Sequence, residues 1–382
     1  MTNYQLTWLR KNLFNTWYNS LLTIVCLIFL FWALQGVITW VTTKAQWTVI
    51  QVNLRLFFVG RFPQTLYWRA WIVLAIATSL SSISCGVFFN KQQFTKLRLA
   101  IFALITSLLL SFLPLDLTSR IWLLFNAFLL LTGSWIGKTF NQVISPWLSL
   151  IWVLSFPIIL WLIGGGFSLQ YVSTNLWNGL LLTVLMALVS IILSFPIGVL
   201  LALGRTSKLP ILRLFSILYI EIVRGLPLIG VLFLAQVMLP LFLPTDWRLD
   251  RVIRGIAGLV LFSAAYMAEN VRGGLQSIPR GQIEAAKALG LKTYLVMLLI
   301  VLPQALRAVI PAIVGQFIGL FKDTSLLSLV GLVELTGIAR SVLAQPQFLG
   351  RYAEVYLFIG LIYWIFCYSM SLVSQRLERQ FK

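Results

Sequence analysis

The sequence predicts an all-α polytopic membrane protein with about eight to ten spans. Of its 382 residues, 60% are hydrophobic and only 10% are charged, and the mean hydropathy is +0.94. A soluble domain carries about 25% charged residues, so this chain is not built to face water on all sides. Apolar stretches of transmembrane-helix length recur from end to end. They predict helices because the strands of a membrane barrel are shorter and alternate.

The charge distribution excludes several function classes. The net charge of +19 reflects basic residues that gather in loops between apolar stretches, as the positive-inside tendency predicts, and does not indicate nucleic-acid binding. Histidine is absent and the three cysteines lack CxxC spacing, so we expect no metal site and no histidine general base. Only Asp116 among the acidic residues precedes Glu221, so the second half holds nearly all the paired charge.

The N-terminal half predicts five spans. Arg10 and Lys11 precede the first and predict a cytoplasmic N-terminus. Residues 45–69 mix polar and apolar side chains and predict an interfacial segment, although its arginines then fall on the outer side, against the usual tendency. The five predicted spans cover residues 20–41, 70–89, 99–114, 121–137 and 147–163.

One motif in this half resembles a phosphate-binding loop. Gly133, Gly137, Lys138 and Thr139 approach the pattern GxxxxGK[ST], but only three residues separate the two glycines. No strand precedes them, and a phosphate cradle needs a strand, a loop and a helix. We therefore predict close helix packing through small residues rather than nucleotide binding.

The second half predicts five more spans, several of them interrupted. A long span over residues 177–203 is followed by a helix that Gly225 and Pro227 break before it continues to about residue 243. Residues 253–268 form the next span. Pro311 breaks the run that follows Pro303, and the last span covers residues 355–373.

Charged residues recur at i,i+3 spacing at the membrane edge. Glu221 and Arg224 share one helix face, and Glu269 and Arg272 repeat the spacing. They are either ligands on a substrate path or internal pairs that neutralise one another at helix ends. A further cluster inside apolar sequence favours a place beside a translocation path, since such groups are costly in lipid unless they line protein or water. Its members are Lys322, Asp323, Thr324 and Ser325.

A short segment between two spans carries the most specific spacing. Glu284, Ala285 and Ala286 are followed by Gly290, and Leu302 and Pro303 come later in the same segment. Small alanines let a short helix lie flush in a partner's groove, and a glycine suits a helix end with positive φ. Pro303 can start the next helix without losing a hydrogen-bond donor.

These motifs resemble the polar amino acid subfamily of ABC importer permeases, and most closely the general L-amino acid permeases with an N-terminal membrane extension. The resemblance covers residues 177–379 and includes the strings NGLLLT, IEIVRGLPL, EAAKALGL, LPQA and KDTSL. It implies a five-helix permease core at residues 171–382, with a cytoplasmic coupling loop at about 278–296, and a membrane extension at residues 1–170. Glu334 departs from the aspartate that the family pattern implies.

The resemblance also implies partners. A homologous second permease subunit would complete a heterodimer, and two cytoplasmic ATPase subunits would bind ATP and magnesium, so that this chain binds no cofactor and is not itself an enzyme. An extracytoplasmic binding protein would deliver the amino acid to this inner-membrane protein, whose two termini would lie in the cytoplasm. The alternative is an ion-coupled secondary transporter or a channel that works alone, because broken helices and intramembrane charges suit it equally.

Overall fold

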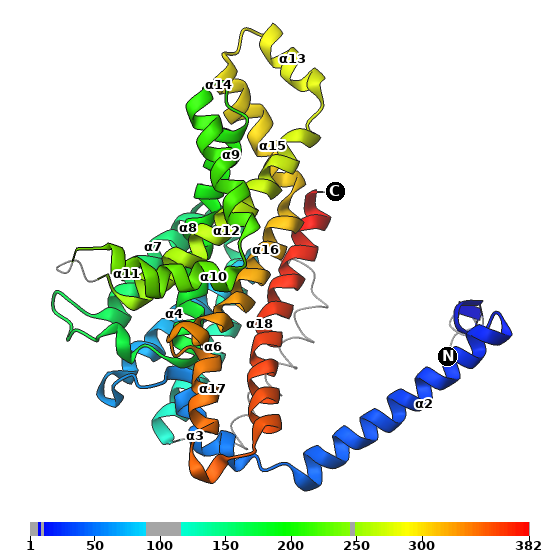
Figure 1. Cartoon of the computed structure of the whole chain (residues 1–382), viewed down its shortest axis with the longest axis vertical. Coiled ribbons are helices and arrows are strands. Elements are labelled where there is room, and N and C mark those ends of the chain that lie inside the picture. The colour runs from blue at the N-terminus through cyan, green and yellow to red at the C-terminus, as the bar shows by residue number, and fades with distance from the viewer. Residues whose placement is uncertain (1–6, 9–10, 89–115, 245–248, 382) are drawn as a thin grey trace.

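The computed structural model describes residues 7–8, 11–88, 116–244 and 249–381, and its regular structure in these ranges is helical (Figure 1). Within them, eight helices are long and apolar enough to cross a membrane, or nine if the bent pair of α9 and α10 counts as one span. The fold-class prediction is thus confirmed. The span predicted at residues 99–114 lies outside the described residues.

The helices follow the predicted order. The N-terminal half comprises α2 (Trp17–Thr39), α3 (Thr48–Val59), α4 (Tyr67–Phe88), α6 (Leu117–Thr139) and α7 (Asn141–Gly164). The second half begins with α8 (Gly179–Arg205), α9 (Pro210–Gly225), α10 (Leu228–Phe233), α11 (Leu239–Phe242) and α12 (Arg251–Ser277). It continues with α13 (Arg280–Ala288), α14 (Thr293–Leu295), α15 (Leu302–Ala308), α16 (Ile310–Asp323), α17 (Leu335–Leu343) and α18 (Tyr352–Phe381).

The glycines of the phosphate-loop-like motif lie inside α6 and pack against α4. A Cβ on Gly133 would collide with the Ser82 hydroxyl, and one on Gly137 would collide with the backbone of Ile83. Gly86 on α4 meets the backbone of Ser134 in the same way. The prediction of small-residue helix packing is therefore confirmed.

The segment predicted to be interfacial contains α3, which is too short to span a membrane, as expected. Its apolar side does not simply face lipid, however. Val49 and Phe57 are fully buried in a cluster that α3 shares with α17 and α18.

The arginines of this segment also contact other parts of the protein. Arg69 is buried, and its guanidinium donates to the Gln170 carbonyl at 2.8 Å. Arg55 stacks over the Tyr67 ring at 4.8 Å. Arg69 is thus held inside the protein and the exposed Arg55 against an aromatic ring, which helps explain their departure from the positive-inside pattern.

α8 and α12 are parallel and form the centre of the second half. Gly255 near the start of α12 approaches Met186, while Met267 further along approaches Gly198. Each helix has 27 residues and is therefore roughly 40 Å long, enough to cross a bilayer. α9 and α10 meet at an angle of 106°, so the break predicted at Gly225 is confirmed.

Glu334 is a fully buried carboxylate that fixes the start of α17. Its oxygens accept from the backbone N–H groups of Thr336 at 2.8 Å and Gly337 at 2.9 Å, which makes it the N-cap. The Tyr363 hydroxyl donates to it at 3.1 Å. The neighbouring Leu335 N–H donates to the Thr183 hydroxyl of α8 at 3.0 Å. One side chain thereby ties α17 to α18 beside the start of α8.

We expect Glu334→Ala to lower the free energy of unfolding by about 3 kcal/mol, because it removes an N-cap and leaves the buried Tyr363 hydroxyl without its acceptor. Glu334→Gln keeps a carbonyl oxygen in the same place and should lose less than half as much. Thermal unfolding of the two purified variants measures the difference. Equal losses would show that a carbonyl oxygen at this position is not enough to cap α17, and no loss in either variant would show that the cap does not stabilise it.

Candidate functional site

α13 is a nine-residue helix at one extreme end of the molecule, beyond the bundle (Figure 1). The side chains of Glu284 and Ala285 are exposed. Ala286 is buried and packs with Val296 and Val301, which attaches α13 to the segment that follows it. α13 therefore presents a small, polar face outward and keeps an apolar face against its own chain.

Gly290 ends this helix in the left-handed conformation, with φ +80°. Its N–H donates to the Lys287 carbonyl at 2.9 Å, and the Leu291 N–H donates to the Ala286 carbonyl at 3.2 Å. Such paired bonds close a helix C-terminus, and glycine adopts the required φ most easily. Beside it, Leu289 is 83% exposed, so an apolar side chain stands at the tip of the segment.

The structure places Leu302 and Pro303 at the start of α15, with Pro303 in the first turn as the sequence predicts. Gln304 connects this turn to α13, since its amide donates to the Gln282 side chain at 3.4 Å. All six residues predicted to couple to a partner therefore belong to one segment, from α13 to α15.

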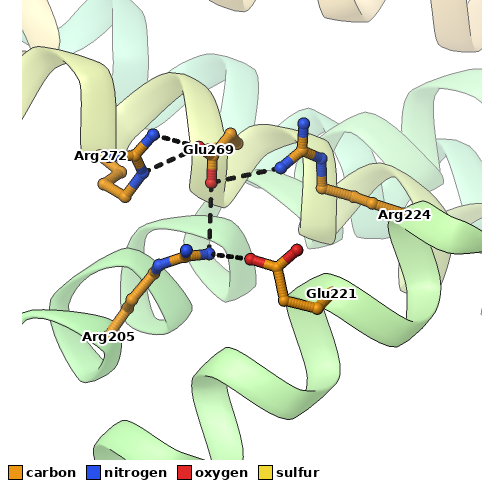
Figure 2. Close-up of polar contacts among 5 residues, drawn as sticks. All are labelled: Arg205, Glu221, Arg224, Glu269 and Arg272. Atoms are coloured by element: carbon orange, nitrogen blue, oxygen red, sulfur yellow. Dashed lines mark hydrogen bonds and ion pairs between the residues drawn. The ribbon is translucent and has the colours of Figure 1, made fainter.

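A five-residue ion-pair cluster, shown in Figure 2, joins α8, α9 and α12 toward the end of the bundle that carries α13. Glu269 of α12 lies at its centre and contacts three arginines. Arg272 donates to it through Nε at 2.8 Å and also through Nη2, while Arg205 and Arg224 each place Nη1 at 3.5 Å from its Oε2. Arg205 also pairs with Glu221 at 2.9 Å.

This cluster differs from the pairing expected from i,i+3 spacing. The Glu269–Arg272 pair is present, but Glu221 and Arg224 each contact a residue of another helix. Sequence reasoning missed Arg205, which resembled an ordinary basic residue at a span end. Three arginines and two carboxylates leave one positive charge in excess. The cluster thus neutralises most of its own charge while it connects three helices.

The second set of predicted path residues lies at the end of α16, where the helix tightens into a 3-10 segment (Thr324–Val330). Lys322 is exposed and Asp323 half-buried, and the structure gives neither an ion pair in the part of the chain that it describes. The Thr324 hydroxyl is buried and donates to the Phe321 carbonyl at 2.7 Å. Ser325 is partly buried. No described hydrogen bond or ion pair joins this set to the cluster of Figure 2.

Comparisons with known proteins agree on one family. Residues 194–382 match the model of the binding-protein-dependent transport system inner membrane component. The inner membrane amino-acid ABC transporter permease protein YhdY of Escherichia coli is 40% identical over 98% of this chain and 93% of its own length. The glutamate/glutamine/aspartate/asparagine transport system permease protein BztC of Rhodobacter capsulatus is 35% identical, with the same coverage.

A shorter relative matches only part of this chain. The probable glutamine ABC transporter permease protein GlnP of Bacillus subtilis is 37% identical over 96% of its length but only 56% of this chain. The remainder of this chain corresponds to the N-terminal extension. YhdY and BztC also carry this extension, because they match this chain along nearly its whole length. In this family ATP hydrolysis belongs to a separate subunit. The chain therefore belongs to the amino-acid ABC importer permeases of the inner membrane, in the form that carries an N-terminal extension before the permease core.

Proposed function

We propose that this chain forms part of the translocation path for amino acids and that α13 transmits the movement of a separate ATPase to its helices. The observation that supports this most directly is the shape of residues 278–296, a short helix beyond the bundle with exposed Glu284, Ala285 and Leu289. Such a helix can dock into a groove as a unit, because its own chain already holds its apolar side.

The proposed assembly contains a homologous second permease, two cytoplasmic ATPase subunits that bind ATP and magnesium, and an extracytoplasmic binding protein. In this arrangement α13 and both chain termini are cytoplasmic. The end of α18 lies toward the α13 end of the bundle, which agrees with this orientation (Figure 1). In this proposal residues 1–170 form the extension and residues 171–382 form the core. The substrate is an amino acid, and the polar ones named for BztC form the first test panel.

The ion-pair cluster of Figure 2 is proposed to clamp α8, α9 and α12 together so that they move as one body with α13. Most of its charge is neutralised within the cluster, which favours this role over direct substrate binding. Lys322 and Asp323 form no ion pair with any other residue that the structure describes. They remain the candidates for the substrate path, with Thr324 and Ser325 beside them.

Reconstitution tests the proposal against a stand-alone transporter. The complex with its ATPases in proteoliposomes should accumulate a labelled amino acid when ATP and the loaded binding protein are supplied. It should not do so with an ion gradient alone. Uptake by the isolated chain driven by an ion gradient, without ATPase, would establish the alternative.

The path residues make a separate prediction. We expect Asp323→Asn and Lys322→Met each to change the KM for uptake or the rate by about tenfold to a hundredfold, because each removes a charge able to bind a zwitterion, an interaction of roughly 1.5–3 kcal/mol. Ser328→Ala is the control, since this hydroxyl donates internally to the Ser325 carbonyl. Unaltered kinetics in both charge variants would remove these residues from the path.

A further inference from the structure

A cavity of about 390 Å³ lies where the N-terminal half meets the core. Five chain segments form its walls: the turn after α3, the connection from α7 to α8, the start of α8, the start of α12 and the turn before α17. The residues that matter here are Arg61, Asn175, Trp177, Asn178, Arg251 and Gly331. α12 runs roughly 40 Å from this cavity toward α13, so the cavity and α13 lie at opposite ends of the bundle.

The extension is held directly against the core at this cavity. Gly60 (φ +55°) lies so close to Asn178 that a Cβ would overlap it, and Gly179 (φ +65°) meets the Phe57 carbonyl in the same way. The position of Arg61, the next residue after Gly60, is therefore fixed by backbone contact. This wall of the cavity exists only because the chain carries the extension.

The mouth of the cavity is basic. Arg61 and Arg251 are both exposed, and neither forms an ion pair with a described residue. Arg251 donates to the Asn175 side chain at 2.5 Å. The neighbouring Asp250 is occupied, because it caps α12 and accepts from the Thr174 hydroxyl. No acidic residue is among the described residues that line the cavity, so within this part of the chain the two guanidinium groups face it without a carboxylate in the lining.

Two polar groups in the lining are also unsatisfied. The Trp177 indole N–H and the Asn178 side-chain oxygen are buried, and neither has a hydrogen-bond partner among the described residues. Buried polar atoms of this kind usually have a partner, so an unpartnered pair beside a cavity indicates a ligand or ordered water. The guanidinium groups of Arg61 and Arg251 can donate to a carboxylate. The Trp177 indole offers a neutral donor, and the Asn178 side-chain oxygen offers an acceptor for an N–H group.

We infer that this cavity is an external binding site for a small carboxylate-bearing group, built jointly by the extension and the core. The inference rests on the proposed function for its orientation, which puts the cavity on the extracytoplasmic side. The carboxylate belongs either to the free amino acid or to an acidic side chain of the binding protein. Both sources would place a carboxylate against Arg61 and Arg251. Binding of this carboxylate accounts for positive charge on the outer side.

The test uses the whole permease–ATPase complex in lipid nanodiscs. One arm titrates labelled glutamate and glutamine without binding protein, and the other titrates the loaded binding protein. Arg61→Gln and Arg251→Gln should each weaken one of these two affinities about tenfold or more, and Arg61→Lys should restore part of it. Arg55→Gln is the matched control, because Arg55 lies in the same extension but stacks on Tyr67.

Each arm identifies one source. Weaker binding of the free amino acid assigns the site to the substrate, and weaker binding of the binding protein alone assigns it to that protein's acidic side chain. If Arg61→Gln and Arg251→Gln, with wild-type melting temperatures, leave both affinities within twofold, the inference is overturned. ATP-driven uptake measured on the same preparation separates the two claims. Normal uptake with unchanged affinities refutes only the external site, whereas no ATP-driven uptake by the wild type refutes the proposed function.

Discussion

Gly290→Asp is expected to reduce ATP-driven uptake about a hundredfold while the chain still inserts and assembles in the membrane. Gly290 has φ +80°, and aspartate is among the few L-residues that tolerate this region. A Cβ at Gly290 also meets no atom within 4 Å. The damage should therefore come from placing a carboxylate in a flush docking surface, where an unpaired buried charge costs about 3 kcal/mol or more.

Gly290→Asn separates charge from backbone strain. Asparagine has nearly the same shape and the same tolerance of positive φ, but it is neutral. It should retain most of the uptake that Gly290→Asp loses, in proteoliposomes with equal amounts of ATPase bound or supplied. If purified Gly290→Asp carrier transports normally, α13 does not couple to the motor in the way proposed. If both variants fail equally, backbone conformation rather than the docking surface is responsible.

Glu269→Gln should destabilise the complex more than any other single change in the ion-pair cluster. It removes the one carboxylate that contacts Arg205, Arg224 and Arg272, and among the described ion pairs it leaves these three guanidinium groups with Glu221 as their remaining carboxylate. The Glu269 side chain is 21% exposed, so solvent screens part of this cost. We expect a loss of about 2–3 kcal/mol in unfolding free energy, accompanied by weaker coupling of ATP hydrolysis to uptake.

Glu221→Gln is the matched control for this prediction. Glu221 contacts one arginine and is 56% exposed, so its pair should be worth about 1 kcal/mol or less. Melting curves of the two variants in the same detergent give the comparison, and the ratio of uptake to ATP hydrolysis reports coupling. Equal shifts in melting temperature would show that Glu269 is not the centre of the clamp.

The sequence predicted most features that depend on local pattern. Hydropathy located α8 and α12, and Gly225 and Pro311 marked real helix breaks, because backbone geometry acts on neighbouring residues. The spacing around Gly290 predicted a helix end with positive φ. The glycines of α6 predicted close packing because a missing Cβ matters wherever two helices touch.

Contacts between distant residues could not be predicted in this way. Arg205 and Glu269 lie 64 residues apart, and periodicity along one helix does not indicate which other helix lies beside it. The i,i+3 rule pairs Glu221 with Arg224, yet both reach other helices once α8, α9 and α12 pack. Arg61 belongs to the same class of contact. From the sequence, its charge only departs from the positive-inside pattern, whereas the fold places it in the lining of the same cavity as Arg251.

Labelling of single cysteines tests the central claim most directly, namely that α13 is a cytoplasmic surface gripped by a separate ATPase. In a chain with Cys26, Cys85 and Cys367 replaced by alanine, Leu289→Cys places a thiol at the exposed tip after α13. Phe167→Cys places one at a fully exposed position in the turn between α7 and α8. We predict that a membrane-impermeant maleimide labels Phe167→Cys in intact cells. The same reagent should label Leu289→Cys only in inside-out vesicles stripped of ATPase, and adding the ATPase back should protect this thiol from labelling. Labelling of Leu289→Cys from outside intact cells, or with no protection by the ATPase, would contradict the account.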